Sequence, residues 1–340
     1  MQNKRIVELD ALRGIAAVSV VLFHYLYRFN ELYGHKDLPV NWIEFGQYGV
    51  QLFFIISGFV IYWTINNTKK PADFIVSRFS RLYPVYWASI IVTFFSVGYF
   101  GLEGRDVSTK EALINLIMFQ DYFDVSHVDG VYWTLTVELT FYFWIFSLSL
   151  FNLLKKVEYL CIPVILLGIL HYSGGYELPS WFIKALLIKH LPFFVVGICF
   201  YKIINGLHDK FSIPIILLCL FESGVIHGFS KIGLFASFFI VFYLAVSGRL
   251  PFLANKVLIY LGAISYPLYL IHQNIGYIII NKFYAYNYPA LLGVLTAILF
   301  SILTATLLMK LIEQPLLSLI RSIYKKPKVQ FYANKISNIR

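Results

Sequence analysis

The chain has 340 residues, of which 59% are hydrophobic and only 14% are charged, and its mean hydropathy is +0.71. A soluble domain carries about a quarter charged residues, so this chain has too little polar surface to cover a soluble fold. The net charge of +10 comes from basic residues grouped in short clusters between apolar runs, which is typical of the cytoplasmic loops of membrane proteins and argues against nucleic-acid binding.

A helix needs about 20 mostly apolar residues to cross the bilayer. The sequence predicts ten such spans, at 9–29, 46–66, 83–101, 131–154, 157–172, 184–204, 211–226, 232–248, 257–280 and 289–313. The short segments at 157–172 and 211–226 can be re-entrant or strongly tilted. We therefore predict an all-α polytopic membrane protein, with a transmembrane domain at 1–318 and a short basic cytoplasmic tail at 319–340.

The charges of the connecting segments predict the orientation of these spans. Basic residues dominate alternate loops, beginning with the N-terminus, and acidic residues gather in the loops between, above all in 104–130. Because cytoplasmic loops are rich in Lys and Arg, we expect both termini to be cytoplasmic. Within the outer connection, the stretch Leu113–Phe119 is expected to form a surface helix. The three cysteines lie in apolar runs, so we predict no disulfide framework and no zinc site.

Ionisable residues inside a membrane span are functional candidates, because each costs at least about 2.5–3.5 kcal/mol to bury there. In the first span Arg13 and His24 are eleven positions apart, close to three helical turns, so both side chains project from one face. Asp10 is one turn before Arg13 and within reach of an ion pair. Helix packing would also explain these residues, as an interfacial ion pair and a hydrogen-bonded core histidine.

Glu138 lies about two turns into the fourth span. A buried carboxylate needs a partner, and an imidazole at similar depth, such as that of His24, is one candidate. A carboxylate orients an imidazole and stabilises its protonated form. A hydrogen bond to a Tyr or Ser of another helix is the alternative.

The inner loop after the second span contains Arg78 and Arg81, which share a face if the loop is helical. Two guanidinium groups there suit a phosphate or pyrophosphate group, and anionic lipid headgroups are the alternative. In the second span Gly46, Gly49, Ser57 and Gly58 give a small-residue face that allows close approach. In the ninth span we expect Pro267 to interrupt the helix ahead of His272, and broken helices often line cavities.

These motifs together resemble the acyltransferase-3 family of membrane O-acyltransferases. The resembling segments, in chain order, are Arg13 with His24, the glycine-rich stretch 49–59, Arg78 and Arg81 followed by Pro84, Trp133 to Glu138, Ser265 to His272, and Glu313 with Pro315. Many members carry an additional soluble domain, which we do not expect in this chain, and this leaves open whether a second protein completes the transfer.

The resemblance implies an acyl-CoA co-substrate, most simply acetyl-CoA, and an acceptor hydroxyl on a cell-surface or lipid-linked saccharide. No bound cofactor and no metal are expected, membrane lipids surround the protein, and the bacterial cytoplasmic (inner) membrane is the expected location. By analogy the catalytic residues are His24 and Glu138, the donor-binding residues are Asp10, Arg13, Arg78 and Arg81, and further candidate pore residues are Ser57, Trp133, Tyr266 and His272. His24 acts either as a general base or by accepting the acyl group. The alternative functions are a transporter or flippase, and an assembly partner of a glycan polymerase.

Overall fold

The computed structural model describes residues 6–35, 38–68 and 70–326. Within these ranges the chain is helical and contains no β-strand, which confirms the predicted all-α fold. The chain forms two compact units, which are described one at a time. Unit 1 comprises Met1–Arg13, Val50–Asn67 and Val137–Ile259, and unit 2 comprises Gly14–Gly49, Thr68–Thr136 and Tyr260–Arg340. Most of the predicted cytoplasmic tail, residues 327–340, lies outside the described residues.

Six helical stretches of the described chain are long and apolar enough to cross a membrane. They are Val7–Tyr33, Asn41–Asn66, Pro71–Phe100, Gly130–Leu150, Phe229–Val246 and Ala290–Tyr324. Each coincides with one of the ten predicted spans, and two further apolar helices, Leu191–Ile204 and Ser212–His227, are shorter. The total of ten spans and the cytoplasmic position of both termini remain predictions.

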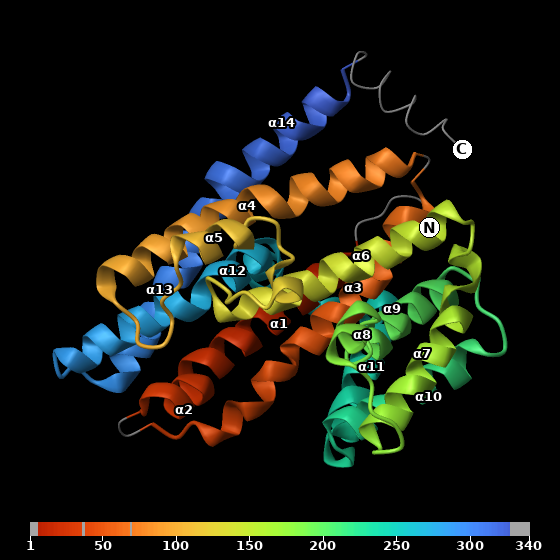
Figure 1. Ribbon diagram of the computed structural model, residues 1–340, viewed down its shortest axis with the longest axis horizontal. Coiled ribbons are helices and arrows are strands. Elements are labelled where there is room, and N and C mark those ends of the chain that lie inside the picture. The colour runs from red at the N-terminus through yellow and green to blue at the C-terminus, as the bar shows by residue number, and fades with distance from the viewer. Residues whose placement is uncertain (1–5, 36–37, 69, 327–340) are drawn as a thin grey trace. The chain divides into compact units, whose positions relative to one another are not determined.

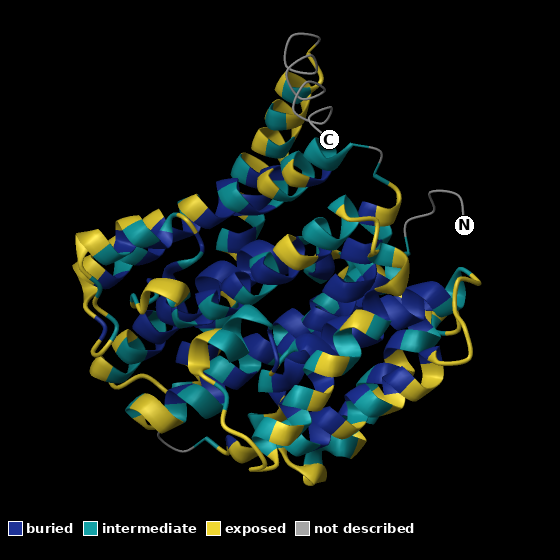
Figure 2. Ribbon diagram, turned by 45° about the vertical axis from the view of Figure 1, so that its right-hand side comes forward, coloured by how far each residue is buried: buried dark blue, intermediate teal, exposed yellow. Residues whose placement is uncertain are grey.

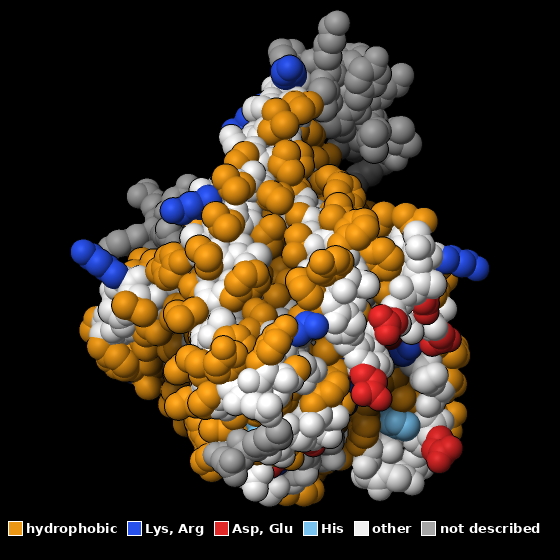
Figure 3. All heavy atoms as spheres, turned by 90° about the vertical axis from the view of Figure 1, so that its left-hand side faces the viewer, with side chains coloured by type: hydrophobic (Ala, Val, Ile, Leu, Met, Phe, Trp, Pro, Cys, Tyr) orange, Lys and Arg blue, Asp and Glu red, His pale blue; other side chains and the backbone are white. Residues whose placement is uncertain are grey.

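The outward faces of the helices are apolar. Exposed residues line the outer faces of the helices in Figure 2, and hydrophobic side chains spread over large parts of the face shown in Figure 3. Helix α13 (Ala290–Leu308) alone exposes Leu291, Leu292, Leu295, Leu299, Phe300, Leu303 and Leu307. Such a surface is costly in water and suits lipid, so the chain is an integral membrane protein.

Unit 1 is a bundle of helices around α9. It contains α3 (Gly49–Asn66), α6 (Trp133–Leu150), α7 (Val157–Tyr172), α8 (Ser180–Ala185), α9 (Leu191–Ile204), α10 (Ser212–His227) and α11 (Ile232–Val246), with short 3₁₀ turns at Leu154–Lys156, Phe229–Lys231 and Pro251–Leu253. Helices α7, α9 and α10 pack against one another and lie together in Figure 1. Every residue of α9 from Leu191 to Lys202 is buried, so α9 is the core of the unit.

Two glycines allow α3 and α9 to cross in direct backbone contact. A Cβ placed on Gly58 would lie 2.1 Å from the carbonyl oxygen of Phe194, and one on Gly197 would lie 2.1 Å from that of Ile55. Neither position tolerates a side chain without separating the helices. The predicted small-residue face therefore serves helix packing at Gly58.

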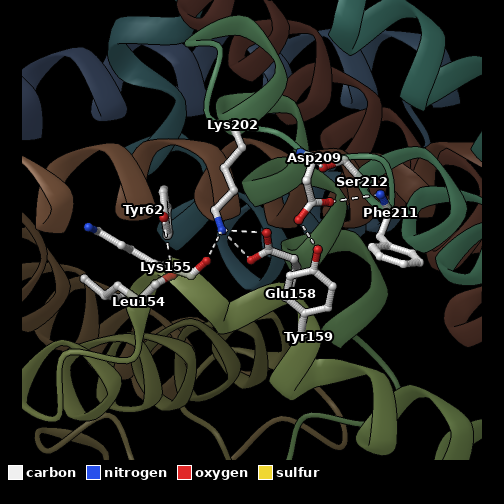
Figure 4. Close-up of polar contacts among 9 residues, drawn as sticks. All are labelled: Tyr62, Leu154, Lys155, Glu158, Tyr159, Lys202, Asp209, Phe211 and Ser212. Atoms are coloured by element: carbon white, nitrogen blue, oxygen red, sulfur yellow. Dashed lines mark hydrogen bonds and ion pairs between the residues drawn. The ribbon is translucent and has the colours of Figure 1, made fainter.

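A buried ion pair joins the beginning of α7 to the end of α9 (Figure 4). The ammonium group of Lys202 donates to the carboxylate of Glu158 and, at 2.8 Å, to the carbonyl oxygen of Lys155. The ring of Tyr62 lies 5.4 Å from the Lys202 ammonium, and its hydroxyl donates to the carbonyl of Leu154. These contacts satisfy both charges, as burial requires.

Unit 2 holds the remaining helices, and the boundary between the units falls within α1, α6 and α12. Its elements are α1 (Val7–Leu22), the π-helix η1 (Phe23–Arg28), α2 (Phe29–Tyr33), the 3₁₀ helix η2 (Asn41–Tyr48), α4 (Pro71–Phe100), α5 (Thr109–Asn115), the 3₁₀ turns η3 (Gln120–Phe123) and η4 (Gly130–Tyr132), α12 (Lys256–Ala285), α13, the π-helix η8 (Met309–Glu313) and α14 (Gln314–Tyr324). Gly46 and Gly49 bring the second span against the backbone of α1, at Ser19 and Ala16.

The helix of the outer connection, α5 (Thr109–Asn115), begins and ends four residues earlier than the one predicted at Leu113–Phe119. Helix α5 begins after Ser108, whose side chain forms a capping box with Glu111. It ends at Asn115, whose side-chain amide donates to the carbonyls of Glu111 and Ser126. Beyond it Met118 has a φ of 62°, which no helix accommodates.

Helix α12 is continuous through Pro267, contrary to the expected interruption. A proline removes one hydrogen-bond donor from a helix, and neighbouring groups in a buried setting compensate for that loss. Here every residue from Ile264 to Ile278 is buried. The packing around α12 therefore outweighs the effect of the proline.

Candidate active site

Two histidines from distant parts of unit 2 are in contact. His24 is the second residue of η1, and His272 lies in the buried middle of α12. The Nδ1 atom of His24 lies 3.1 Å from Nε2 of His272, and the ring centroids are 4.9 Å apart. His272 is fully buried, whereas His24 is half-buried. The structure thus brings together two of the candidate residues that the sequence singled out separately.

Tyr25 fixes the position of this histidine pair. Its hydroxyl donates to the carbonyl oxygen of His272 at 2.7 Å and lies 2.7 Å from the hydroxyl of Ser301. Its ring packs directly on Gly276, where a Cβ would lie 2.1 Å from the ring. Because Tyr25 follows His24 in the chain, these contacts hold η1 against α12.

Two π-helical segments of the described chain contain candidate residues. His24 lies in η1, and Glu313 is the last residue of η8. A π-helical turn inserts an extra residue into a helix and is frequently found at functional sites. The change of helical register at Phe23 sets the direction of the His24 side chain, which the sequence pattern did not reveal.

A polar cluster around Asp129 lies next to the histidine pair. The sequence did not reveal it, because Asp129 was assigned there only as a charge of the outer loop. Asp129 is fully buried, and its carboxylate accepts from the backbone N–H groups of Asn274, at 3.1 Å, and Val131, at 3.2 Å. Burial raises the pKa of Asp129 to about 7, against the opposing effects of these hydrogen bonds and of Arg105. The guanidinium of Arg105 lies over the ring of Tyr277, 5.8 Å from its centroid.

The residues of α12 beside this cluster hold two buried acceptors. The side-chain oxygens of Gln273 and Asn274 are buried and have no hydrogen-bond partner among the described residues. The amide nitrogen of Asn274 donates to Val128, and that of Gln273 donates to the hydroxyl of Tyr277. The segment 272–274 is therefore a polar stretch inside an otherwise apolar helix.

In unit 1 the carboxylate of Glu138 is bound by hydroxyl groups. Ser57 of α3 donates to it at 3.0 Å, and Tyr142, one turn further along α6, donates as well. Ser57 and Glu138 were both predicted site residues, and the structure brings these two together. The predicted pairing of Glu138 with His24 joins residues of different units and remains a prediction.

Arginines gather where α4 and α14 pack together in unit 2 (Figure 1). Arg81 forms an ion pair with the buried Glu313, and Arg78 donates to the hydroxyl of Ser77. Arg321 of α14 lies within electrostatic range of both Arg78 and Arg81. The sequence assigned Arg321 only to the basic tail, because its position beside α4 depends on how α14 packs.

Four other predicted residues occupy the following positions. Asp10 and Arg13 lie half-buried on α1, one turn apart. Trp133 is half-buried at the start of α6, and Tyr266 is buried in α12, where its hydroxyl donates to the carbonyl of Leu82 at 2.8 Å. Among the described residues, no group of three or more His, Cys, Asp or Glu side chains is arranged to hold a metal ion.

The apolar outer faces of the helices and the polar side chains buried between them define the class of this chain: it is an integral membrane protein with buried polar clusters. A family model described as an acyltransferase domain matches residues 6–310, so the chain belongs to the acyltransferase-3 family. This confirms the resemblance carried by the motifs. Glu313, Pro315 and Arg321 lie beyond the matched region.

Several characterised or named proteins are similar to the chain. Peptidoglycan O-acetyltransferase OatA of Listeria monocytogenes is 26% identical over 49% of this chain and 28% of its own length. Nodulation protein 10 of Rhizobium leguminosarum bv. viciae is 29% identical over 47% of this chain and 48% of its own length. The putative acetyltransferase ORF330 of Acidianus two-tailed virus is 21% identical over 80% of this chain and 84% of its own length. The chain thus spans less than half the length of the first two, and no solved structure matches it.

Proposed function

We propose that this protein is a membrane O-acyltransferase that moves an acyl group, most simply acetyl, from acyl-CoA to a hydroxyl of a cell-surface or lipid-linked saccharide. The observation that carries the proposal is the environment of His24. Within the described residues only its Nδ1 atom is engaged in hydrogen bonds, which leaves Nε2 available for a substrate. The name of the Listeria relative supports a saccharide acceptor and an acetyl group.

The chemistry assigns one proton transfer to His24. Nε2 takes the proton of the acceptor hydroxyl as the oxygen attacks the thioester carbonyl carbon. The carbon–sulfur bond breaks, and the coenzyme A thiolate leaves and takes that proton from the imidazolium. The products are the saccharide ester and free coenzyme A. A positioned general base of this kind contributes about 10²–10⁴-fold in rate.

The donor's phosphates suit the arginines of α4 and α14. Coenzyme A is a polyanion, and one guanidinium group can bind two oxygens of a phosphate at the same time. Arg78, Arg81 and Arg321 supply three positive charges, of which Glu313 neutralises one. The positive-inside pattern of the sequence predicts that Arg78, Arg81 and Arg321 face the cytoplasm, where acyl-CoA is made. Asp10 and Arg13 are candidates for contacts nearer the thioester. The bacterial cytoplasmic membrane is the corresponding location.

Glu138 has a supporting role in this proposal. A carboxylate held by two hydroxyl groups is a fixed negative charge, and such a charge stabilises a cation that forms during the reaction. The sequence predicts that the imidazolium of His24 is that cation. Ser57 and Tyr142 then set the direction of the carboxylate.

The test compares surface polysaccharide from cells that carry the wild-type protein, His24→Ala, or the control His208→Ala, in a background without the native gene. His208 lies exposed between α9 and α10. Mass analysis of the polysaccharide is expected to show the acyl increment with the wild type and the control, and its loss with His24→Ala. A His24→Ala protein that is present in the membrane at the wild-type level and acylates at the normal rate would refute the proposal.

A further inference from the structure

The contacts of His272 determine which of its ring nitrogens carries the proton. Nδ1 of His272 lies 2.9 Å from the carbonyl oxygen of Tyr269 and 3.2 Å from that of Leu268. A carbonyl oxygen only accepts hydrogen bonds, so Nδ1 must carry a hydrogen. In the neutral ring the other nitrogen, Nε2, is then a hydrogen-bond acceptor.

The same reasoning fixes the tautomer of His24. Its Nδ1 lies 2.9 Å from the carbonyl oxygen of Val20 and 3.1 Å from Nε2 of His272. Both neighbours are acceptors, so the hydrogen of His24 is on Nδ1 and is shared between them. The opposite arrangement would direct a lone pair of Nδ1 at the Val20 carbonyl. The basic nitrogen of His24 is therefore Nε2, the atom without a partner among the described residues.

We propose that His272 is the positioning residue of the catalytic histidine. Its Nε2 accepts the Nδ1 hydrogen of His24, which helps to keep His24 Nε2 in the basic form and stabilises the imidazolium once Nε2 has taken the acceptor proton. This inference rests on the proposed function, in which His24 is the base. It gives His272 the orienting role that a carboxylate has in hydrolase triads.

The surroundings of His272 suit this role. The ring is fully buried, and its own helix binds Nδ1 through two carbonyls. The residue's backbone carbonyl accepts the hydroxyl of Tyr25. The carbonyls bound to Nδ1 hold the ring, and Tyr25 holds the backbone of the residue. Nε2 of His272 is therefore directed toward His24. A hydrogen bond to a cationic donor is about twice as strong as a neutral one, so the pair is strengthened when the reaction places a proton on His24.

The kinetic test uses His272→Leu, His272→Gln and the control His208→Gln in purified protein. His272→Leu removes the acceptor and is expected to lower kcat by about 10²–10³-fold, within the range of a general-base contribution, with the KM for acyl-CoA changed less than about twofold. The amide oxygen of glutamine can replace Nε2 as an acceptor. His272→Gln is therefore expected to keep kcat within about tenfold of the wild type, and His208→Gln to match it.

A readout of proton position separates this role from a merely structural one. Nuclear magnetic resonance of protein labelled with ¹⁵N-histidine, with His24 assigned through His24→Gln, is expected to show both rings protonated at Nδ1. A coupling across the hydrogen bond from His24 Nδ1 to His272 Nε2 is expected in the wild type and absent from His272→Gln. The acid limb of the kcat–pH profile should also move in His272→Leu. Among the described residues of unit 2, Arg28 and Arg105 act electrostatically on His24, and both are unchanged in these variants.

Two results would overturn the inference. One is a wild-type His24 protonated at Nε2 instead of Nδ1. The other is a folded His272→Leu protein whose kcat and pH profile match the wild type. If His272→Leu does not fold, His272→Gln and the wild-type spectrum still decide the question. Either overturning result leaves the proposed function standing as long as His24→Ala abolishes acyl transfer.

Discussion

Gly276 is the position where the smallest possible change should disturb the histidine pair. A Cβ on Gly276 would lie 2.1 Å from Cε1 of Tyr25, 2.2 Å from its Cζ and 2.4 Å from its hydroxyl oxygen. Carbon atoms in favourable contact are about 3.5–4.0 Å apart. Gly276→Ala must therefore move the ring of Tyr25 by more than about 1 Å, or separate η1 from α12.

The cost follows from how Tyr25 is held. Its ring is fully buried, and its hydroxyl bonds to His272 and Ser301. Overpacking a buried site costs about 1–3 kcal/mol, and we expect the free energy of unfolding to fall by that amount. Tyr25 also adjoins His24, and a displacement of about 1 Å in a catalytic group costs about 10²-fold in rate.

The assay measures kcat with acyl-CoA and saccharide in purified Gly276→Ala, together with thermal unfolding. Gly98→Ala is the matched control, because Gly98 lies in α4 with nothing within 4 Å of its Cβ position. The control is expected to keep full activity and to gain up to about 1 kcal/mol from alanine's helix propensity. A Gly276→Ala protein with wild-type kcat and an unchanged Tm would show that Tyr25 does not hold the pair.

Further variants test three other features of the structure. Gly58→Ala places a Cβ 2.1 Å from the carbonyl oxygen of Phe194, and we expect a loss of about 1–3 kcal/mol in thermal unfolding. Lys202→Met leaves the carboxylate of Glu158 buried without its cation, and we expect the free energy of unfolding to fall by about 3–5 kcal/mol. The double variant Lys202→Met with Glu158→Met removes both charges and should recover most of that free energy. Burial raises the pKa of Asp129 to about 7 from its ordinary 3.8. The protonated carboxyl group therefore stabilises the folded protein, and this contribution to the free energy of unfolding is fully present below pH 3.8. It falls as the pH rises and has decreased by about 4 kcal/mol at about pH 7. Asp129→Asn should flatten that pH dependence, and a wild-type slope in the variant would contradict the assignment.

Much of the fold follows from the sequence, because apolar runs of spanning length leave the chain few alternatives to membrane helices. The exceptions are instructive. Helix α12 has 30 residues, but His272, Gln273 and Asn274 interrupt its apolar character, so its length exceeds what hydropathy alone supports. The continuity of this helix through Pro267 depends on packing that no local pattern records.

The candidate site is only partly visible in the sequence. The cost of burying an ionisable group in the membrane singled out His24, Glu138 and His272, and the family motifs include all three. The contact between His24 and His272 joins residues 248 positions apart, so only the packing of η1 against α12 reveals it. Tyr142 lies four residues after Glu138, and helical spacing alone would have found that partner.

Other features escaped the sequence for a different reason. Asp129 looks like a surface charge because it stands in an acidic loop, and its burial depends on the loop packing on α12. Arg321 looks like part of a basic tail, and its place within electrostatic range of Arg78 depends on α14 packing against α4. Two contacts stabilise that packing: the ion pair of Arg81 with Glu313, and the hydrogen bond that the Tyr324 hydroxyl donates to Asp73.

The most direct test of the account is transfer by the purified protein in lipid vesicles. Acyl-CoA labelled in its acyl group is supplied with a saccharide acceptor, and both the label in the saccharide and the free coenzyme A thiol are measured. We expect equal amounts of labelled ester and free thiol with the wild type, and neither with His24→Ala. A wild-type protein that consumes no thioester while moving an acyl or glycan compound across the vesicle membrane would contradict the account and identify a transporter.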